Sequence, residues 1–209
     1  MAKDYPTNPF NILGVYFSAS TQIKHEGMHW YSDANEICDK IATKYKTDTW
    51  LVAGVVAALS PNVRWERNVT DAELILAAEY ADDVDWRSTT VSAYPLNRAK
   101  AVTIMDNNLT ASDDIHSVLN GNKTKAFFTC ISNPKDFDAV CVDGHARCIF
   151  YGVREALKSK SMGDREYNHI ANAYREAARI ISDIEGEHIL PMQVQAVTWC
   201  HWRIHHGIA

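Results

Sequence analysis

The sequence predicts an all-α fold, and three observations support this prediction. Apolar residues recur at the three- and four-residue spacing of helices through most of the chain. Strand-like alternation of apolar and polar residues is almost absent. Proline, glycine and an Asn-Pro pair stand where the periodic stretches end. With 209 residues, 46% of them hydrophobic, the chain suits one domain over 1–209, with room for two lobes.

Four helices are expected in the first half of the chain. Trp50 to Leu59 is apolar on every side, which predicts a buried central helix, and Ser60-Pro61-Asn62 ends it. Acidic and polar residues from 81 to 90 predict a loop, and a further helix follows Pro95. The four expected helices span 30–45, 50–59, 63–80 and 97–105.

Nine or ten helices are expected in all, and five of them can be placed in the second half. Ser112, Asp113 and Asp114 offer side-chain oxygens to free backbone amides, so they are predicted to cap a short helix that ends near Leu119. The next helix follows Gly121 and ends at Asn133-Pro134. The five expected helices span 112–119, 122–131, 144–149, 164–184 and 191–206.

Composition excludes several classes of protein. The formal net charge of −5 argues against a general nucleic-acid coat, but a local basic face is compatible with it, because affinity depends on the phosphates contacted. The longest apolar run, Trp50 to Leu59, is too short for a bilayer, so no membrane partner is expected. The first ten residues lack the apolar segment of a signal peptide, which predicts a cytoplasmic protein.

Cysteines and histidines predict no metal centre. The five cysteines are scattered without a CxxC pair or a Cys/His ligand spacing, which favours buried, reduced thiols. Three of the nine histidines, His201, His205 and His206, lie close together near the C-terminus. Because no acidic residue nearby completes a ligand set, we expect no zinc site there.

A glycine-containing turn precedes two lysines in the middle of the chain. Gly121 permits a tight turn, and the helix that starts at once would direct free amides near Asn122 to Thr124 towards one phosphate. Lys123 and Lys125 add positive charge at the same point. An ordinary helix corner with solvated lysines would show the same residues.

A single carboxylate follows further along the chain. Residues 139–142 are apolar, so the backbone is expected to reach Asp143 through the core, and Gly144 and His145 follow at the start of the next helix. Asp143 is therefore a good N-cap residue. A capping aspartate beside a cleft can also act in catalysis, because the cap fixes the direction of its carboxylate.

Four segments together resemble one known superfamily. A lysine near a hairpin at about 112–131, followed by Val142-Asp143-Gly144-His145, resembles the helix–hairpin–helix DNA glycosylases of the endonuclease III type. The whole pattern, with Trp30-Tyr31, looks most like a phage-encoded branch of that superfamily. The three other similar segments are Ala57 to Asn62 followed by Trp65 and Asn68, Tyr94 to Ala101, and Trp202 to Gly207.

The chain departs from the pattern of the superfamily at the hairpin. A second glycine is missing after Gly121, so two alignments compete. A shortened turn puts Lys123 at the superfamily's lysine position, and a gapless alignment puts Lys125 there; we prefer Lys123. The four-cysteine iron–sulfur motif of some relatives is absent, so no cluster is implied.

The resemblance implies a DNA N-glycosylase, a hydrolase of base excision repair, that acts on a damaged or modified base flipped into a pocket between two lobes. Asp143 would assist at the sugar C1′, and an attacking lysine would add AP lyase activity. The resemblance also allows a monovalent cation at the hairpin, but no other cofactor, and the cytoplasm of a phage's host as location. The expected DNA-binding residues are Asn62, Gly121, Asn122, Lys125 and His145, and the expected pocket residues are Trp65 and Trp199.

Two other functions remain open at this point. The same fold could transfer a group onto a hypermodified pyrimidine in phage DNA, or it could bind DNA without catalysis. Gln193, Gln195 and Thr198 could read a base edge or satisfy helix packing. The resemblance implies DNA as the partner, and the sequence points to no protein partner.

Overall fold

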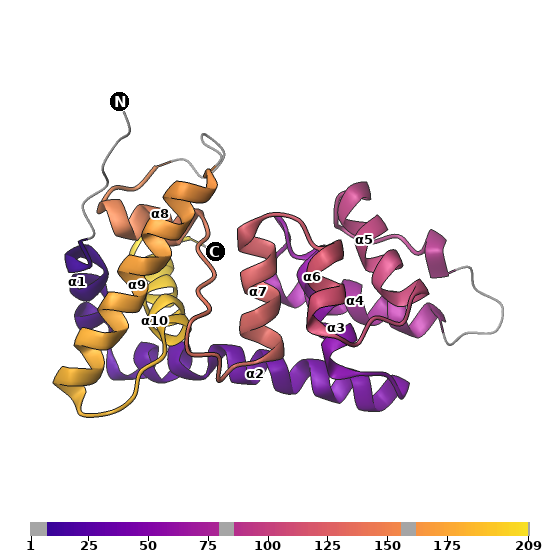
Figure 1. Cartoon of the computed structure of the whole chain (residues 1–209), viewed down its shortest axis with the longest axis horizontal. Helices are drawn as coiled ribbons and strands as arrows, with labels where there is room; N and C mark the ends of the chain where they lie inside the picture. Colours follow the sequence, from indigo (N-terminus) through magenta and orange to yellow (C-terminus); the bar gives the residue numbers. More distant parts are fainter. Residues whose placement is uncertain (1–7, 80–85, 156–161, 209) are drawn as a thin grey trace. The chain divides into compact units, whose positions relative to one another are not determined.

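The computed structural model describes residues 8–79, 86–155 and 162–208, and within these residues the protein is all-α (Figure 1). Ten α-helices and one short 3-10 helix, η1 (Trp86–Ser88), account for all regular structure there, and no strand is formed. The predicted all-α class is therefore confirmed. No helix in the described ranges has the length and apolar character needed to cross a membrane.

The chain divides into two compact units. The first unit comprises residues 1–31 and 135–209, and the second comprises residues 32–134. Helix α2 (Thr21–Tyr45) contributes residues to both units. The five cysteines are free thiols; four of them are buried, as expected, but Cys200 is only partly buried. Burial raises the pKa of Cys38 to about 12.

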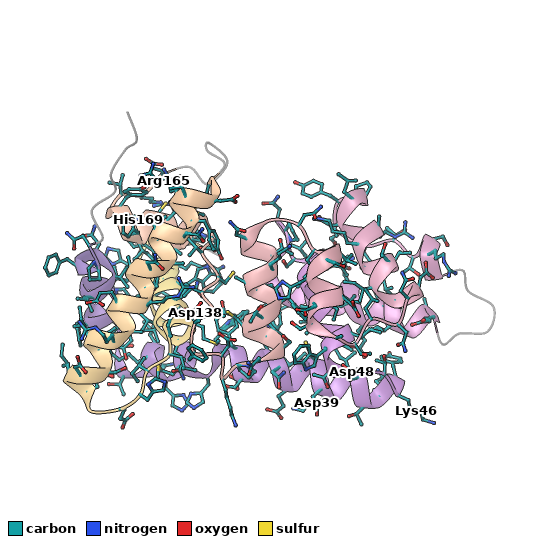
Figure 2. All side chains as sticks on the ribbon, in the orientation of Figure 1. Asp39, Lys46, Asp48, Asp138, Arg165 and His169 are labelled. Atoms are coloured by element: carbon teal, nitrogen blue, oxygen red, sulfur yellow. The ribbon has the colours of Figure 1, made fainter. Side chains whose placement is uncertain are left out.

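The second unit is built around helix α3 (Thr49–Leu59), whose residues from Leu51 onwards are all buried. Asp48 begins the helix, because its carboxylate accepts a hydrogen bond from the Trp50 amide. Asp39 of α2 accepts one from the Thr49 hydroxyl. Figure 2 labels both aspartates. The helices that pack on α3 are α4 (Trp65–Glu79), α5 (Pro95–Asp106), α6 (Ser112–Val118) and α7 (Asn122–Ser132).

Two turns of the second unit differ in how well they were predicted. Gly121 has φ +78° and forms the corner between α6 and α7, as its freedom from a side chain allows. The predicted cap at Ser112, Asp113 and Asp114 is wrong. Ala111 takes the extended cap backbone instead and makes no side-chain cap, so Ser112 is the first helical residue.

The first unit is built around helix α10 (Pro191–His205), most of whose residues from Pro191 to Thr198 are buried. Gly27 of α2 allows a close crossing, because a Cβ atom there would lie 2.5 Å from the Val197 Cα atom. The other helices of this unit are α1 (Phe10–Ser18), which was not predicted, α8 (Gly144–Tyr151) and α9 (Asp164–Glu185).

Candidate active site around Asp143

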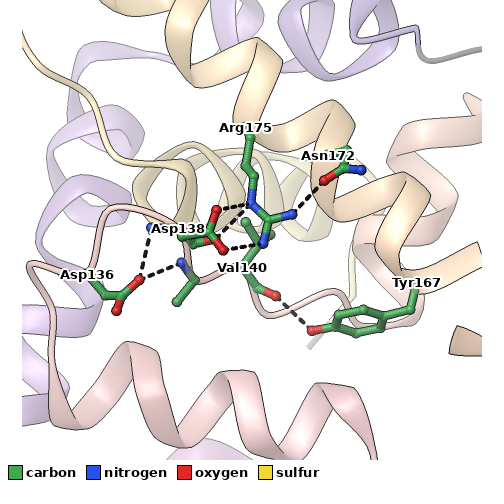
Figure 3. Close-up of polar contacts among 7 residues, drawn as sticks. Asp136, Asp138, Val140, Tyr167, Asn172 and Arg175 are labelled. Carbon is green, nitrogen blue, oxygen red and sulfur yellow. Dashed lines mark hydrogen bonds and ion pairs between the residues drawn. The ribbon is translucent and has the colours of Figure 1, made fainter. Parts of the chain in front are cut away.

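The segment that leads to Asp143 is held by side chains rather than by a sheet. The Asp136 carboxylate accepts hydrogen bonds from the amides of Asp138 and Ala139, at 2.9 and 2.7 Å, which forms a local turn. Arg175 of α9 binds both the carboxylate and the backbone carbonyl of Asp138 (Figure 3). Helix α9 therefore fixes the start of the segment.

A buried tyrosine fixes the end of the same segment. The Tyr167 hydroxyl donates to the Val140 carbonyl at 2.7 Å and accepts from the Val142 amide at 3.2 Å (Figure 3 shows the first contact). Val140, Cys141 and Val142 are buried, as the apolar run predicted. The Val142 amide also donates to the Val140 carbonyl at 3.1 Å, so the Tyr167 hydroxyl adds a second contact to each of these buried backbone groups and fixes the path to Asp143.

Asp143 is half-buried and both of its carboxylate oxygens are engaged. Oδ1 accepts a hydrogen bond from the Ala146 amide at 2.8 Å, so Asp143 is the N-cap of α8, as predicted. Oδ2 accepts a hydrogen bond from the indole Nε1 of Trp199 at 3.0 Å. Two donors from two helices hold the carboxylate in one direction, and each oxygen retains a lone pair for a substrate group.

Aromatic and cationic side chains surround Trp199. The His145 ring lies edge-on to it, with ring centroids 6.3 Å apart, and the Trp30 ring lies 6.4 Å away. The guanidinium carbon of Arg203 lies 4.2 Å from the centroid of the Trp199 ring, in cation–π contact. Asp143, His145 and Trp199 were predicted from sequence, and the structure brings these three together.

The negative charge of Asp143 affects the pKa of a buried tyrosine, Tyr174. The hydroxyl of Tyr174 lies 3.4 Å from that of Thr198, and both residues are fully buried. Burial raises the pKa of Tyr174, and the negative charge of Asp143 raises it further, although the contact with Thr198 acts the other way. Tyr174 therefore remains a neutral phenol around neutral pH.

The remaining predicted residues belong to the second unit. Asn62 is exposed, has φ +63°, and its Nδ2 atom donates to the Tyr94 hydroxyl at 3.3 Å. Trp65 packs edge-on against Phe127. The other predicted residues lie at the corner between α6 and α7: Gly121, Asn122, Lys123 and Lys125. Lys123 is exposed, and Lys125 is half-buried.

Polar residues on α10 mostly serve the packing of helices. The Gln193 side chain accepts from the Leu190 amide and donates to the Met28 carbonyl, so it closes the start of α10. Gln195 accepts a buried hydrogen bond from the Tyr31 hydroxyl at 2.7 Å. These contacts favour the packing role over the base-reading role.

Sequence reasoning missed three residues of this site: Tyr167, Tyr174 and Arg203. Tyr167 and Tyr174 lie seven residues apart on one buried face of α9, a spacing visible in the sequence but equally typical of core residues. Arg203 follows Trp199 by one helical turn, which is a usable signal for stacking within a helix. No group of three acidic, histidine or cysteine side chains in the described part of the chain could hold a metal ion.

Comparisons with known proteins identify a family but no activity. A model of a family of unknown function, DUF7178, matches residues 6–206. No curated protein and no solved structure matches the chain significantly. Because the family model spans nearly the whole sequence, the chain belongs to the DUF7178 family.

Proposed function

We propose that this protein is a DNA glycosylase that releases a damaged or modified base from a flipped nucleotide. The observation that carries the proposal is the Asp143 carboxylate, held by the Ala146 amide and the Trp199 indole at the start of α8. The sequence resemblance to helix–hairpin–helix glycosylases adds support. A fixed, half-buried negative charge suits a reaction that develops positive charge on a sugar.

In the proposed reaction the bond between the sugar C1′ and the base nitrogen breaks. Its electron pair leaves with the base, and positive charge develops on the sugar ring. Asp143 stabilises this charge by electrostatics and orients the group that attacks C1′. If that group is water, its oxygen bonds to C1′, its proton is lost, and the product is an abasic site.

A lysine as the attacking group would give strand cleavage in addition. The amine must be neutral to attack, so the complex with DNA must favour its uncharged form. The new bond joins the lysine nitrogen to C1′ and becomes an imine that borohydride reduces to a stable crosslink. We propose Lys123 for this role and Lys125 for phosphate binding.

The corner between α6 and α7 is proposed to act as the DNA-binding hairpin of the superfamily. Gly121 leaves open space where a side chain would stand, because a Cβ atom there would have no neighbour within 4 Å. A phosphate could therefore approach the backbone at the start of α7 closely. Asn62, at the tip of its turn, is proposed to fill the gap left by the flipped nucleotide.

The proposal is tested with a panel of duplexes that each carry one damaged or modified base. Nucleosides and free bases are measured by mass spectrometry after incubation with the protein and with the Asp143→Asn variant. Released base and abasic DNA in the wild-type sample alone are the expected result. A heavier nucleoside with an intact bond between sugar and base would instead show group transfer. DNA binding without any product, unchanged in Asp143→Asn, would show a non-catalytic protein.

Trapping with borohydride then assigns the lysine. Lys123→Gln is expected to lose the crosslink to DNA, and Lys125→Gln is expected to keep it while binding more weakly. The reverse result would exchange the two roles. If neither wild type nor variants form a crosslink while base is released, water is the attacking group.

A further inference from the structure

Helix α10 ends in a group of basic side chains that the proposed chemistry does not use. Gly207, with φ +59°, closes the helix: its amide donates to the Ile204 carbonyl, and the Ile208 amide donates to the Arg203 carbonyl. Arg154, from the segment after α8, is close enough for its charge to lower the pKa of His206. We call these residues the α10 basic cluster: Arg154, His201, Arg203, His205 and His206.

Among the residues that the structure describes, the two arginines of the cluster lack the carboxylate partners that Arg147, Arg175 and Arg179 have. Arg147, Arg175 and Arg179 each form ion pairs with aspartate or glutamate side chains. Within the described residues, neither Arg154 nor Arg203 forms such a pair. Unpaired arginines that share one region with histidines leave a local excess of positive charge on a protein of net charge −5.

The histidines also lack partners at defined atoms. Nδ1 of His201 and Nε2 of His206 are buried and have no hydrogen-bond partner in the described part of the chain. The His201 and His205 rings stack with centroids 6.0 Å apart, and the His205 and His206 rings lie 4.9 Å apart. Burial lowers the pKa of His201 and of His206, and the neighbouring His205 lowers both further. Protonating these rings places like charges together, which an anion would offset.

The helix end by itself does not account for the cluster. The C-terminus of a helix carries about half a negative charge, which one cation in the last turn already offsets. Arg154 comes from outside the helix, and it would add repulsion unless a further negative group were present. Acidic groups near the cluster have other partners: Asp143 is bound to Trp199, and Glu155, next to Arg154 in the chain, pairs with Arg147. Glu26 acts on Cys200, whose pKa burial raises to about 11.

The geometry of the Arg203 side chain favours phosphate as a ligand. A guanidinium that stacks on an indole keeps its N–H groups directed outwards in one plane, which fits two oxygens of a phosphate. The stacking partner of Arg203 is Trp199, whose indole N–H binds the Asp143 carboxylate. Trp202, packed on His206 with ring centroids 4.2 Å apart, adds an aromatic surface of the kind that nucleic-acid sites use.

We propose that the α10 basic cluster binds phosphate groups of the DNA strand that presents its nucleotide to Asp143. The inference rests on DNA being the substrate, and it says which surface of the first unit contacts the strand. Arg203 binds the phosphate nearest the reacting nucleotide, and Arg154 and the histidines bind its neighbours.

The test measures oligonucleotide affinity at several salt concentrations for wild type, Arg203→Gln and Arg154→Gln. Arg179→Gln is the matched control, because it removes the same charge from an exposed arginine of α9 that is paired with Glu176 and Asp183. A plot of log affinity against log salt has a negative slope for duplex DNA. Each cluster variant is expected to make this slope shallower by about 0.9, and the control is expected to leave it unchanged. Equal slopes in all four proteins would overturn the inference.

A second measurement separates DNA from free phosphate compounds. The indole N–H resonance of Trp199 is followed by NMR during titration with inorganic phosphate and with a short oligonucleotide. Inorganic phosphate and the oligonucleotide are each expected to shift this resonance in wild type and in Arg179→Gln, but not in Arg203→Gln. A shift with phosphate and none with the oligonucleotide would overturn the assignment to DNA.

The two proposals can fail separately. A protein that binds DNA through the cluster yet releases no base from any duplex keeps this surface and loses the proposed chemistry. A protein that releases base, and whose cluster variants bind DNA as wild type does, keeps the chemistry and loses this surface.

Discussion

The indole Nε1 of Trp199 donates a hydrogen bond to Oδ2 of Asp143 at 3.0 Å, so helix α10 orients the carboxylate that begins α8. Their positions in sequence, 143 and 199, are far apart, and only folding of the first unit joins them. This contact makes Trp199 a positioning residue, and it can be removed without removing the ring.

Replacing Trp199 with phenylalanine keeps an aromatic ring for Arg203 and His145 but removes the N–H donor. A hydrogen bond to a charged group contributes about 1.5–3 kcal/mol, so base release under single-turnover conditions should slow about tenfold or more. Trp50→Phe, in the second unit, is the control and should react at the wild-type rate. Equal rates for both variants would contradict a positioning role.

Asp143 is expected to contribute to stability and to catalysis through different properties. Asparagine can still accept the hydrogen bond from Ala146, so Asp143→Asn should unfold at nearly the wild-type denaturant concentration and lose activity. Alanine removes the cap as well, so Asp143→Ala should lose about 1 kcal/mol of stability in addition. Chemical denaturation and base release, measured on the same preparations, separate the two effects. Activity retained in Asp143→Asn would exclude a catalytic charge.

Helix boundaries were largely predictable because the chain carries strong local signals. Pro191 at the start of α10 and Asn133-Pro134 at the end of α7 limit the backbone directly, whatever surrounds them. Asp143 was recognisable as a cap for the same reason. Helix α1 was missed, because its nine residues include Gly14 and several β-branched or aromatic residues, and its stability depends on packing against α8, α9 and α10.

The partners of Asp143 were less predictable than Asp143 itself. Trp199 was expected to line a pocket, but nothing in the local sequence indicates that its N–H binds a carboxylate 56 residues away. Tyr167 holds the segment before Asp143 through backbone groups, which carry no sequence signal. Contacts of this kind depend on how helices distant in sequence pack together.

Stability should depend on pH through His116 of the second unit. Burial lowers the pKa of His116 from 6.5, and Lys125 lowers it further, whereas Asp113 acts in the opposite direction. The folded protein therefore binds fewer protons than the unfolded chain between the two pKa values. Its free energy of unfolding should fall as pH falls through 6.5, until the folded pKa is reached. His116→Gln should make this fall smaller than in wild type, as measured by denaturation at a series of pH values. An NMR titration that placed the pKa of His116 above 6.5 would reverse the sign.

Two glycines that both lie within helices should respond in opposite ways to the same change. At Gly27 an added Cβ atom would lie 2.5 Å from the Val197 Cα and 2.6 Å from its nitrogen, and backbone atoms cannot move aside as a side-chain end can. Gly27→Ala should therefore cost about 2 kcal/mol or more, or prevent folding.

Gly14 of α1 is the matched control for this crossing. A Cβ atom there would meet nothing within 4 Å, so alanine should stabilise the protein by about 0.5–1 kcal/mol through its higher helix propensity. Thermal unfolding of both variants under one set of conditions provides the comparison. If Gly27→Ala were as stable as Gly14→Ala, α2 and α10 would not cross as closely as the structure shows. Contacts other than this crossing would then have to hold Trp199 beside Asp143.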